Sequence, residues 1–234
     1  MKIYSDEQLM NYEKKYEQAC SEVELLEDEK MVHCTDSGSH GGTCYFPEWA
    51  LTSKARGYSL WKKEWLKPQA LGTNRDYWGF CATENRNPKV HQLVANYFKD
   101  ESDLIVLEFF GEEGTEIHHE IPIEIPEHLR CGSEENAQER IEHCMKCNAK
   151  SNLSYQEKGN DHPDDGRVTR GNETRGEETG IEAWSDDLKL FRSLGANSTL
   201  SDGNSFGSRI VYSKDEDGNL IRSRKMKLNL KGTN

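Results

Sequence analysis

One segment of this chain limits the size of any core that it can form. Residues 156–180 contain almost no apolar side chain and many Gly, Asp and Glu, which predicts a linker. The apolar residues cluster before this segment, from Phe46 to Phe110, and after it, from Ile181 to Ile221. Because only 34% of the 234 residues are hydrophobic and the mean hydropathy is −0.92, we expect a modest core with polar arms.

The spacing of apolar residues predicts an α+β fold. Ser5 opens a helical pattern with Gln8 at the capping-box position, and its apolar stripe continues to about Lys30. Residues 49–80 have the pattern of short strands and turns, and Lys89–Phe98 has that of a short helix. We further expect a buried strand at 104–110, a strand at 115–118, helices at 133–148 and 181–195, and a hairpin at 209–230.

These elements group into four expected parts. They are an acidic helix with a Gly/Ser loop at 1–45, a central unit at 46–155, the linker at 156–180, and a helix with a basic hairpin at 181–234. No window approaches the ~18 apolar residues of a membrane-spanning helix, and the N-terminus has no apolar signal core. We therefore expect a cytoplasmic protein without a membrane partner. The seven cysteines, an odd number, fit a reduced compartment better than a disulfide scaffold.

The charge is negative overall but unevenly distributed. A formal net charge of −12 argues against simple nucleic-acid binding. Residues 48–99, however, carry nine Lys and Arg against four acids. A local basic surface can bind phosphates on an acidic protein, because exposed charges farther than about 10 Å away are screened by salt. The candidate phosphate-binding residues are Lys54, Arg56, Lys62, Lys63, Lys67, Arg75 and Lys89.

A pair of histidines ends the strand expected at 115–118. His118 and His119 are followed, about 25 residues later, by a predicted helix that carries further nitrogen, sulfur and oxygen ligands. Because neighbouring residues of a strand point to opposite faces, one His can face a metal and the other a water nucleophile. Imidazole suits both tasks, since its ordinary pKa is about 6.5.

The same helix contains two cysteines at zinc-ligand spacing. Cys144 and Cys147 could bind Zn²⁺, but on a helix this spacing also places two small apolar side chains on one core face. A full zinc site needs two more ligands. The nearest candidates are Cys131, His128 and His143, with Cys34 and Cys44 more distant along the chain.

Two stretches resemble a known family. The sequences IHHEIP at 117–122 and HCMKCNAKSN at 143–152 resemble the motif of HNH nucleases, which have the ββα-metal fold. Upstream, residues 49–69 and the helix KVHQLVANYF at 89–98 resemble the strand/helix DNA-binding segment that precedes this motif in phage and intron-encoded homing endonucleases. The resemblance covers roughly residues 49–155, so the central unit at 46–155 is expected to combine a DNA-binding segment with an HNH-like core.

The resemblance implies roles for particular residues. His118 would bind the metal, His119 would be the general base, and Asn136 would brace the catalytic loop. The last metal ligand would be Asn148 or Asn152. His91 matches a family histidine on the upstream helix, where a packing or backbone-bonding role is expected rather than that of a ligand. The catalytic ion would be Mg²⁺ or Mn²⁺, with Zn²⁺ as a structural candidate at Cys131, Cys144, Cys147 and His143.

The function implied by this resemblance is metal-dependent hydrolysis of phosphodiester bonds in double-stranded DNA, as in homing endonucleases. Two alternatives stay open. One is a non-catalytic, zinc-stabilised protein-interaction module, and the other is an HNH-like RNase. Cleavage that a chelator abolishes would separate the enzymes from the binding module.

Overall fold

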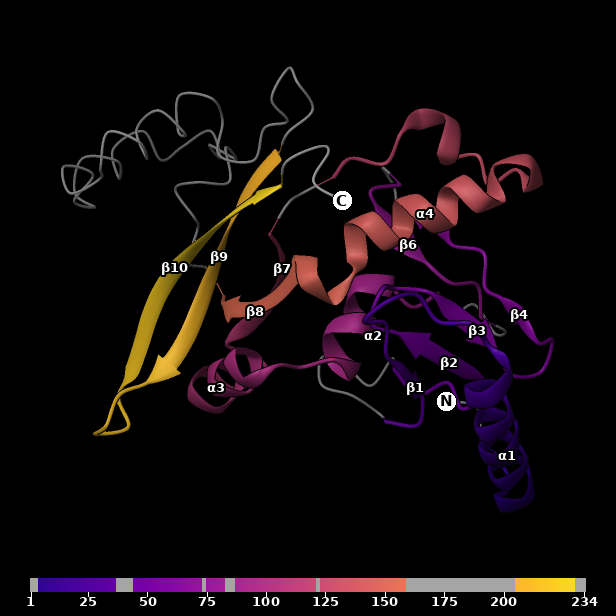
Figure 1. The fold of residues 1–234 in the computed structure, drawn as a ribbon, viewed down its shortest axis with the longest axis horizontal. Helices are drawn as coiled ribbons and strands as arrows, with labels where there is room; N and C mark the ends of the chain where they lie inside the picture. Colours follow the sequence, from indigo (N-terminus) through magenta and orange to yellow (C-terminus); the bar gives the residue numbers. More distant parts are fainter. Residues whose placement is uncertain are drawn as a thin grey trace.

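The computed structural model describes residues 4–36, 44–72, 75–82, 87–120, 123–158 and 205–229, with the side chains of 211–223 in the last range. These residues form a mixed arrangement of helices and antiparallel strands, as expected for α+β (Figure 1). The helix predicted at 181–195 and most of the predicted linker lie outside the described residues. No helix in the described ranges has the length and apolar character that a bilayer crossing requires.

Helix α1, Asp6–Glu22, begins at the predicted residue. The Ser5 side chain accepts a hydrogen bond from the backbone of Gln8, and the Gln8 side chain accepts one from the backbone of Ser5. The helix ends at Glu22 rather than near Lys30, because the chain turns back into strand β1, Met31–His33. The Tyr16 hydroxyl donates to the Met31 carbonyl at 3.0 Å and so ties the helix to this strand.

Strand β1 is the edge of a four-stranded antiparallel sheet. Its order is β1-β2-β3-β4, with β2 at Trp49–Thr52, β3 at Gly57–Ser59 and β4 at Glu64–Trp65. A second antiparallel pair joins β5, Gln69–Leu71, to β6, Tyr77–Gly79. The short strands predicted at 49–80 are therefore confirmed. The expected boundary at residue 45 runs through the first sheet, since β1 pairs with β2.

Two helices follow these strands. Helix α2, Val90–Tyr97, agrees with the prediction, whereas the strand predicted at 104–110 is wrong. That segment belongs to helix α3, Glu101–Phe110, which begins with a reciprocal cap between Asp100 and Asp103 and ends at Gly111, whose φ is +68°. A continuous apolar run has no periodicity that separates helix from strand, so the capping residues were the better signal.

The histidine pair ends strand β7, Thr115–His119, which pairs with β8, Leu153–Glu157. Helix α4, Ala137–Asn148, lies between these strands in the chain, with short 3₁₀ turns at Glu127–Leu129, Glu134–Asn136 and Lys150–Asn152. Because β8 continues to Glu157 and Gln156 is buried, the predicted linker cannot begin at residue 156.

The C-terminal hairpin is confirmed as β9, Ser205–Lys214, and β10, Leu220–Asn229, joined by the turn at Asp217-Gly218. It lies beside α3 at one side of the molecule (Figure 1). The backbone N–H of Tyr212 donates to the Ser102 hydroxyl at 2.9 Å, and the Tyr212 side chain is buried. A single apolar cluster joins residues of β2, β6, α2, α3, α4, β8 and β9.

Candidate active site

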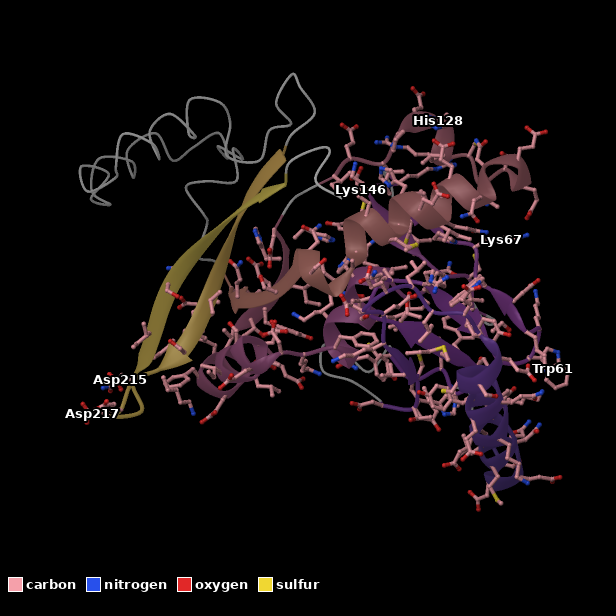
Figure 2. The ribbon with its side chains drawn as sticks, viewed as in Figure 1. Trp61, Lys67, His128, Lys146, Asp215 and Asp217 are labelled. Carbon is pink, nitrogen blue, oxygen red and sulfur yellow. The ribbon has the colours of Figure 1, made fainter. Side chains whose placement is uncertain are left out.

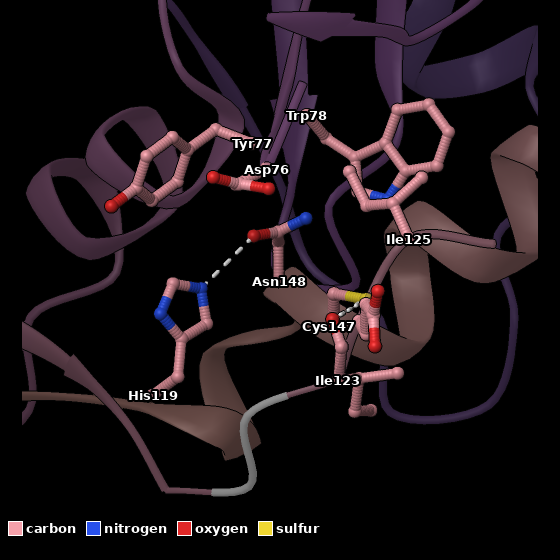
Figure 3. Close-up of a pocket in the computed structure, with 9 residues that line it drawn as sticks. Asp76, Tyr77, Trp78, His119, Ile123, Ile125, Cys147 and Asn148 are labelled. Atoms are coloured by element: carbon pink, nitrogen blue, oxygen red, sulfur yellow. Dashed lines mark hydrogen bonds between the residues drawn. The ribbon is translucent and has the colours of Figure 1, made fainter. Parts of the chain in front are cut away.

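His119 lines a pocket of about 320 Å³ at the end of β7 (Figure 3). The pocket lies where β7, β6 and the C-terminal end of α4 meet, so residues distant in sequence share it. The residues that line it are Asp76, Tyr77, Trp78, His119, Ile123, Glu124, Ile125, Cys147 and Asn148.

A hydrogen bond to Asn148 fixes which nitrogen of His119 carries the proton. The Asn148 side-chain N–H donates to the Cys144 carbonyl at 3.1 Å, which directs the amide oxygen toward His119. That oxygen lies 3.2 Å from His119 Nε2 and can only accept a hydrogen bond (Figure 3). Neutral His119 is therefore protonated at Nε2, and its lone pair is on Nδ1.

Burial keeps His119 in this neutral form. Removal of the ring from water lowers the pKa of His119, and the nearby His118 lowers it further, while the bond to Asn148 acts in the opposite direction. A base must be unprotonated to accept a proton. His119 thus has the protonation state and the tautomer that a general base needs near neutral pH.

His91 of α2 packs against His119 on the protein side. The two ring centroids are 5.1 Å apart with an interplanar angle of 73°. His91 is 7% exposed, and within the described ranges its Nδ1 has no hydrogen-bond partner. Burial lowers the pKa of His91 to about 3, so it is neutral at ordinary pH. The ring of Tyr77 contacts His91 at 5.3 Å, and Lys89 Nζ lies 4.0 Å over that tyrosine ring.

The other residues predicted to act with the histidine pair are placed differently. Asn136 lies at the opposite end of α4 from Asn148, about 18 Å along a helix of this length, and it donates to the His128 carbonyl. Asn136 thus contacts the segment that follows the histidine pair and neither histidine itself, and its role in bracing the catalytic loop stays a prediction. Asn152 is buried and donates to the Cys147 carbonyl at 2.8 Å. His118 pairs with Ser154 in the sheet, so strand alternation turns it away from the face on which His119 meets Asn148.

Only two of the four predicted zinc ligands, Cys147 and His143, lie together. Cys147 Sγ lies 3.3 Å from His143 Nδ1, which also accepts a hydrogen bond from Trp78 Nε1 at 3.1 Å. Cys144 instead faces the core, with its sulfur 4.0 Å from the Ala55 carbonyl. The exposed Cys131 contacts the His128 carbonyl. Among the described residues, no group of three or more His, Cys, Asp or Glu side chains could hold a metal ion.

Six of the seven predicted phosphate-binding cations have partners outside the pocket, and none of the six lines it. The partners are Glu29 for Arg56, Glu64 for Lys62, Glu22 for Lys63, Glu134 for Lys67, and the backbone carbonyls of Glu27 for Lys54 and of Arg130 for Arg75. The acidic N-terminal segment therefore supplies the partners of Lys54, Arg56 and Lys63.

These pairs differ in strength. The Glu29 carboxylate is fully buried and Arg56 also lies 3.9 Å over the Trp65 ring, so Arg56 is not available to a phosphate. The pairs of Lys62 and Lys63 are about half exposed and contribute little individually. Two predicted cations lie next to pocket residues: Arg75, which donates to the Arg130 carbonyl at 2.9 Å, precedes Asp76, and Lys89 lies over the ring of Tyr77.

Local sequence patterns do not indicate several residues of the pocket. Asp76, Tyr77 and Trp78 enter through β6, and nothing in their spacing distinguishes them from other short-strand residues. The exposed Lys146 lies on the last turn of α4 beside Cys147 (Figure 2).

The chain matches no protein-family description, no curated protein and no solved structure.

Proposed function

We propose that this chain is a metal-dependent endonuclease that hydrolyses phosphodiester bonds in DNA, with His119 as its general base. The observation that carries the proposal is the hydrogen bond from His119 Nε2 to Asn148, which leaves Nδ1 as the basic nitrogen of a histidine that lines the pocket. This arrangement agrees with the role that the HNH resemblance implies for His119.

The proposed reaction needs a water molecule activated beside the scissile phosphate. His119 Nδ1 accepts the proton of that water, and Asn148 holds the ring and stabilises the imidazolium that forms. A positioned base of this kind typically contributes about 10²–10⁴-fold in rate. The chain order is β7, α4 and then β8, so the helix that supplies Asn148 lies between the two strands and does not follow them as in the ββα order of the HNH motif.

The pocket has oxygen donors that suit Mg²⁺ or Mn²⁺. Asp76 and Asn148 both line it, and Mg²⁺ usually takes one or two protein carboxylates and completes its shell with water and substrate phosphate. Asp76 therefore replaces His118 and Asn152 as the residue best suited to hold the ion with Asn148. When bound, the ion would stabilise charge on the phosphate and on the leaving oxygen.

The charges near the pocket favour a polyanionic substrate over a protein partner. Arg75, Lys89 and Lys146 flank it, although Asp76 and Glu124 also line it. The alternative of a zinc-stabilised interaction module is less well supported, because Cys144 and Cys147 face different surroundings. An RNase would use the same groups, so the substrate has to be tested directly.

The test is cleavage of plasmid DNA and of a structured RNA with Mg²⁺, Mn²⁺ or EDTA. We expect DNA cleavage that EDTA abolishes and added Mg²⁺ or Mn²⁺ restores, with His119→Ala slower by about 10²–10⁴-fold. His128→Ala is the matched control, since His128 is exposed and pairs with Glu139 at 2.9 Å. Wild-type rates in His119→Ala would overturn the assignment of the base, and cleavage of RNA alone would overturn the substrate.

A further inference from the structure

Two imidazoles meet at the protein side of the pocket, and only one of them has a role in the proposed reaction. His119 comes from β7 and His91 from α2, and their ring centroids are 5.1 Å apart. A buried polar atom without a partner usually costs about 1–3 kcal/mol, so the buried Nδ1 of His91 needs an explanation.

The spacing of the rings matches that of two histidines bound to one metal ion. With metal–nitrogen distances of about 2.0–2.1 Å, two imidazoles that share a tetrahedral ion have ring centroids about 5 Å apart. The observed distance of 5.1 Å agrees with this spacing. Packing alone would also allow this distance, but packing does not account for a His91 Nδ1 that has no partner among the described residues.

The hydrogen bonds of His119 also resemble those of a metal-binding histidine. Histidines that bind metals commonly donate their other ring N–H to a carbonyl oxygen, which fixes the tautomer. His119 does so, because Nε2 donates to the Asn148 amide oxygen and leaves the lone pair on Nδ1. We infer that His91 and His119 form a two-imidazole site for a divalent ion such as Zn²⁺, Co²⁺ or Ni²⁺, and that this ion inhibits the enzyme.

The ligand chemistry separates this ion from the catalytic one. Imidazole nitrogen suits Zn²⁺, Co²⁺ and Ni²⁺, whereas Mg²⁺ prefers oxygen ligands. Within the described ranges no third His, Cys, Asp or Glu joins the pair, so water completes the coordination and binding is reversible. Occupation of His119 Nδ1 removes the basic lone pair. This inhibition rests on the proposed function, whereas the binding does not.

The binding is tested by calorimetric titration of the whole chain with Zn²⁺ alone. We expect His91→Gln and His119→Gln each to weaken the same site by at least about 10-fold, which is the lower end of the effect of losing a group at a metal site. His128→Gln is the matched control and should bind as the wild type does. Exposed Cys20, Cys81 and Cys131 can bind zinc elsewhere, so only a site lost in both histidine variants counts. An unchanged titration in either variant overturns the inference.

A second measurement uses only the wild-type protein, so its result holds even if the histidine variants fold poorly. In protein labelled with ¹⁵N-histidine, Zn²⁺ should shift the ring nitrogens of two histidines together, and a shift of one or none overturns the site. Nuclease assays then separate the two proposals. If the protein binds zinc at this pair but has no nuclease activity, the zinc site stands and the proposed function is refuted. If the protein is an active nuclease that zinc does not inhibit, the proposed inhibition is refuted.

Discussion

At the scale of single residues, the tautomer of one histidine is set by an amide two elements away. Asn148 has a donor that must face the Cys144 carbonyl, so its oxygen must face His119. The proton of His119 is therefore placed by the C-terminal turn of α4, and the free lone pair follows from it. Strand β7, which carries His119, does not determine this tautomer.

Replacement of Asn148 tests that dependence. We expect Asn148→Ala to lower the cleavage rate by roughly 10–100-fold, because the ring of His119 loses the group that orients it. Asn136→Ala is the matched control, since Asn136 lies at the far end of α4 and should leave the rate unchanged. Single-turnover rates would measure both. A larger loss in Asn136→Ala than in Asn148→Ala would contradict the geometry.

At the scale of elements, α1 is attached to the first sheet through a histidine. The ring of His33 stacks on Tyr16 at 5.0 Å and its Nε2 donates to the Pro47 carbonyl at 2.6 Å. Burial lowers the pKa of His33 below that of the unfolded chain, so the unfolded state takes up the proton first as pH falls. The stability that His33 contributes is present above about pH 6.5 and is lost as pH falls below that value.

We therefore expect wild-type protein to lose more stability between about pH 7 and 5.5 than His33→Gln does. Urea unfolding at both pH values measures the difference. The other histidines are the same in both proteins, so the difference between them reports on His33. As a control, His128→Gln should lose as much stability over this pH range as the wild type does. Equal losses in wild type and His33→Gln would show that the docking of α1 does not depend on this proton.

Helix α3 is joined to β8 by a buried carboxylate. Asp103 accepts the Tyr155 backbone N–H at 2.9 Å and pairs with Lys150 at 2.7 Å, and its side chain is 1% exposed. We expect Asp103→Ala to lower the free energy of unfolding by about 3 kcal/mol, because the buried Tyr155 N–H loses its acceptor, the cap of α3 loses one hydrogen bond, and Lys150 keeps only Asp100 and the Leu153 carbonyl. Glu101→Gln on the same helix turn should change it by less than about 0.5 kcal/mol. Chemical denaturation of both variants checks this, and equal effects would contradict it.

At the scale of the whole molecule, the distribution of charge depends on which segments the fold brings together. Trp61 and Lys67 lie on one side of the molecule, while Asp215 and Asp217 mark the tip of the hairpin on the other (Figure 2). Acidic residues of the N-terminal segment pair with the basic residues of 54–63. The basic stretch seen in the sequence is thus largely paired with acids, while Lys62, Lys63 and Lys67 remain exposed at the surface.

DNA binding should follow the position of the cations rather than their number. We expect the double variant Lys89→Ala, Lys146→Ala to lower the salt slope of DNA binding by about two units, roughly one for each phosphate that a lysine no longer neutralises. The double variant Lys62→Ala, Lys63→Ala removes the same charge outside the pocket and should therefore change the slope less. Titrations over a range of salt concentrations would measure both slopes. Equal slopes would show that the pocket does not define the binding face.

Features that depend on neighbouring residues could be predicted from the sequence alone. The cap at Ser5, the helix at 90–97, the strand that ends in the histidine pair and the C-terminal hairpin all follow from local spacing and local hydrogen bonds. Local signals also explain the wrong strand at 104–110, because this apolar run lacks the periodicity that identifies a helix, and its cap lies just before it.

The residues that meet at the site were brought together by tertiary packing. Asn148 rather than Asn136 contacts His119, because α4 brings its C-terminal end to β7. His91 lies against His119 because α2 packs beside the same strand, and Asp76 joins them through β6. Such contacts join segments far apart in the chain, and their geometry comes from the packing of whole elements, which residue spacing does not encode.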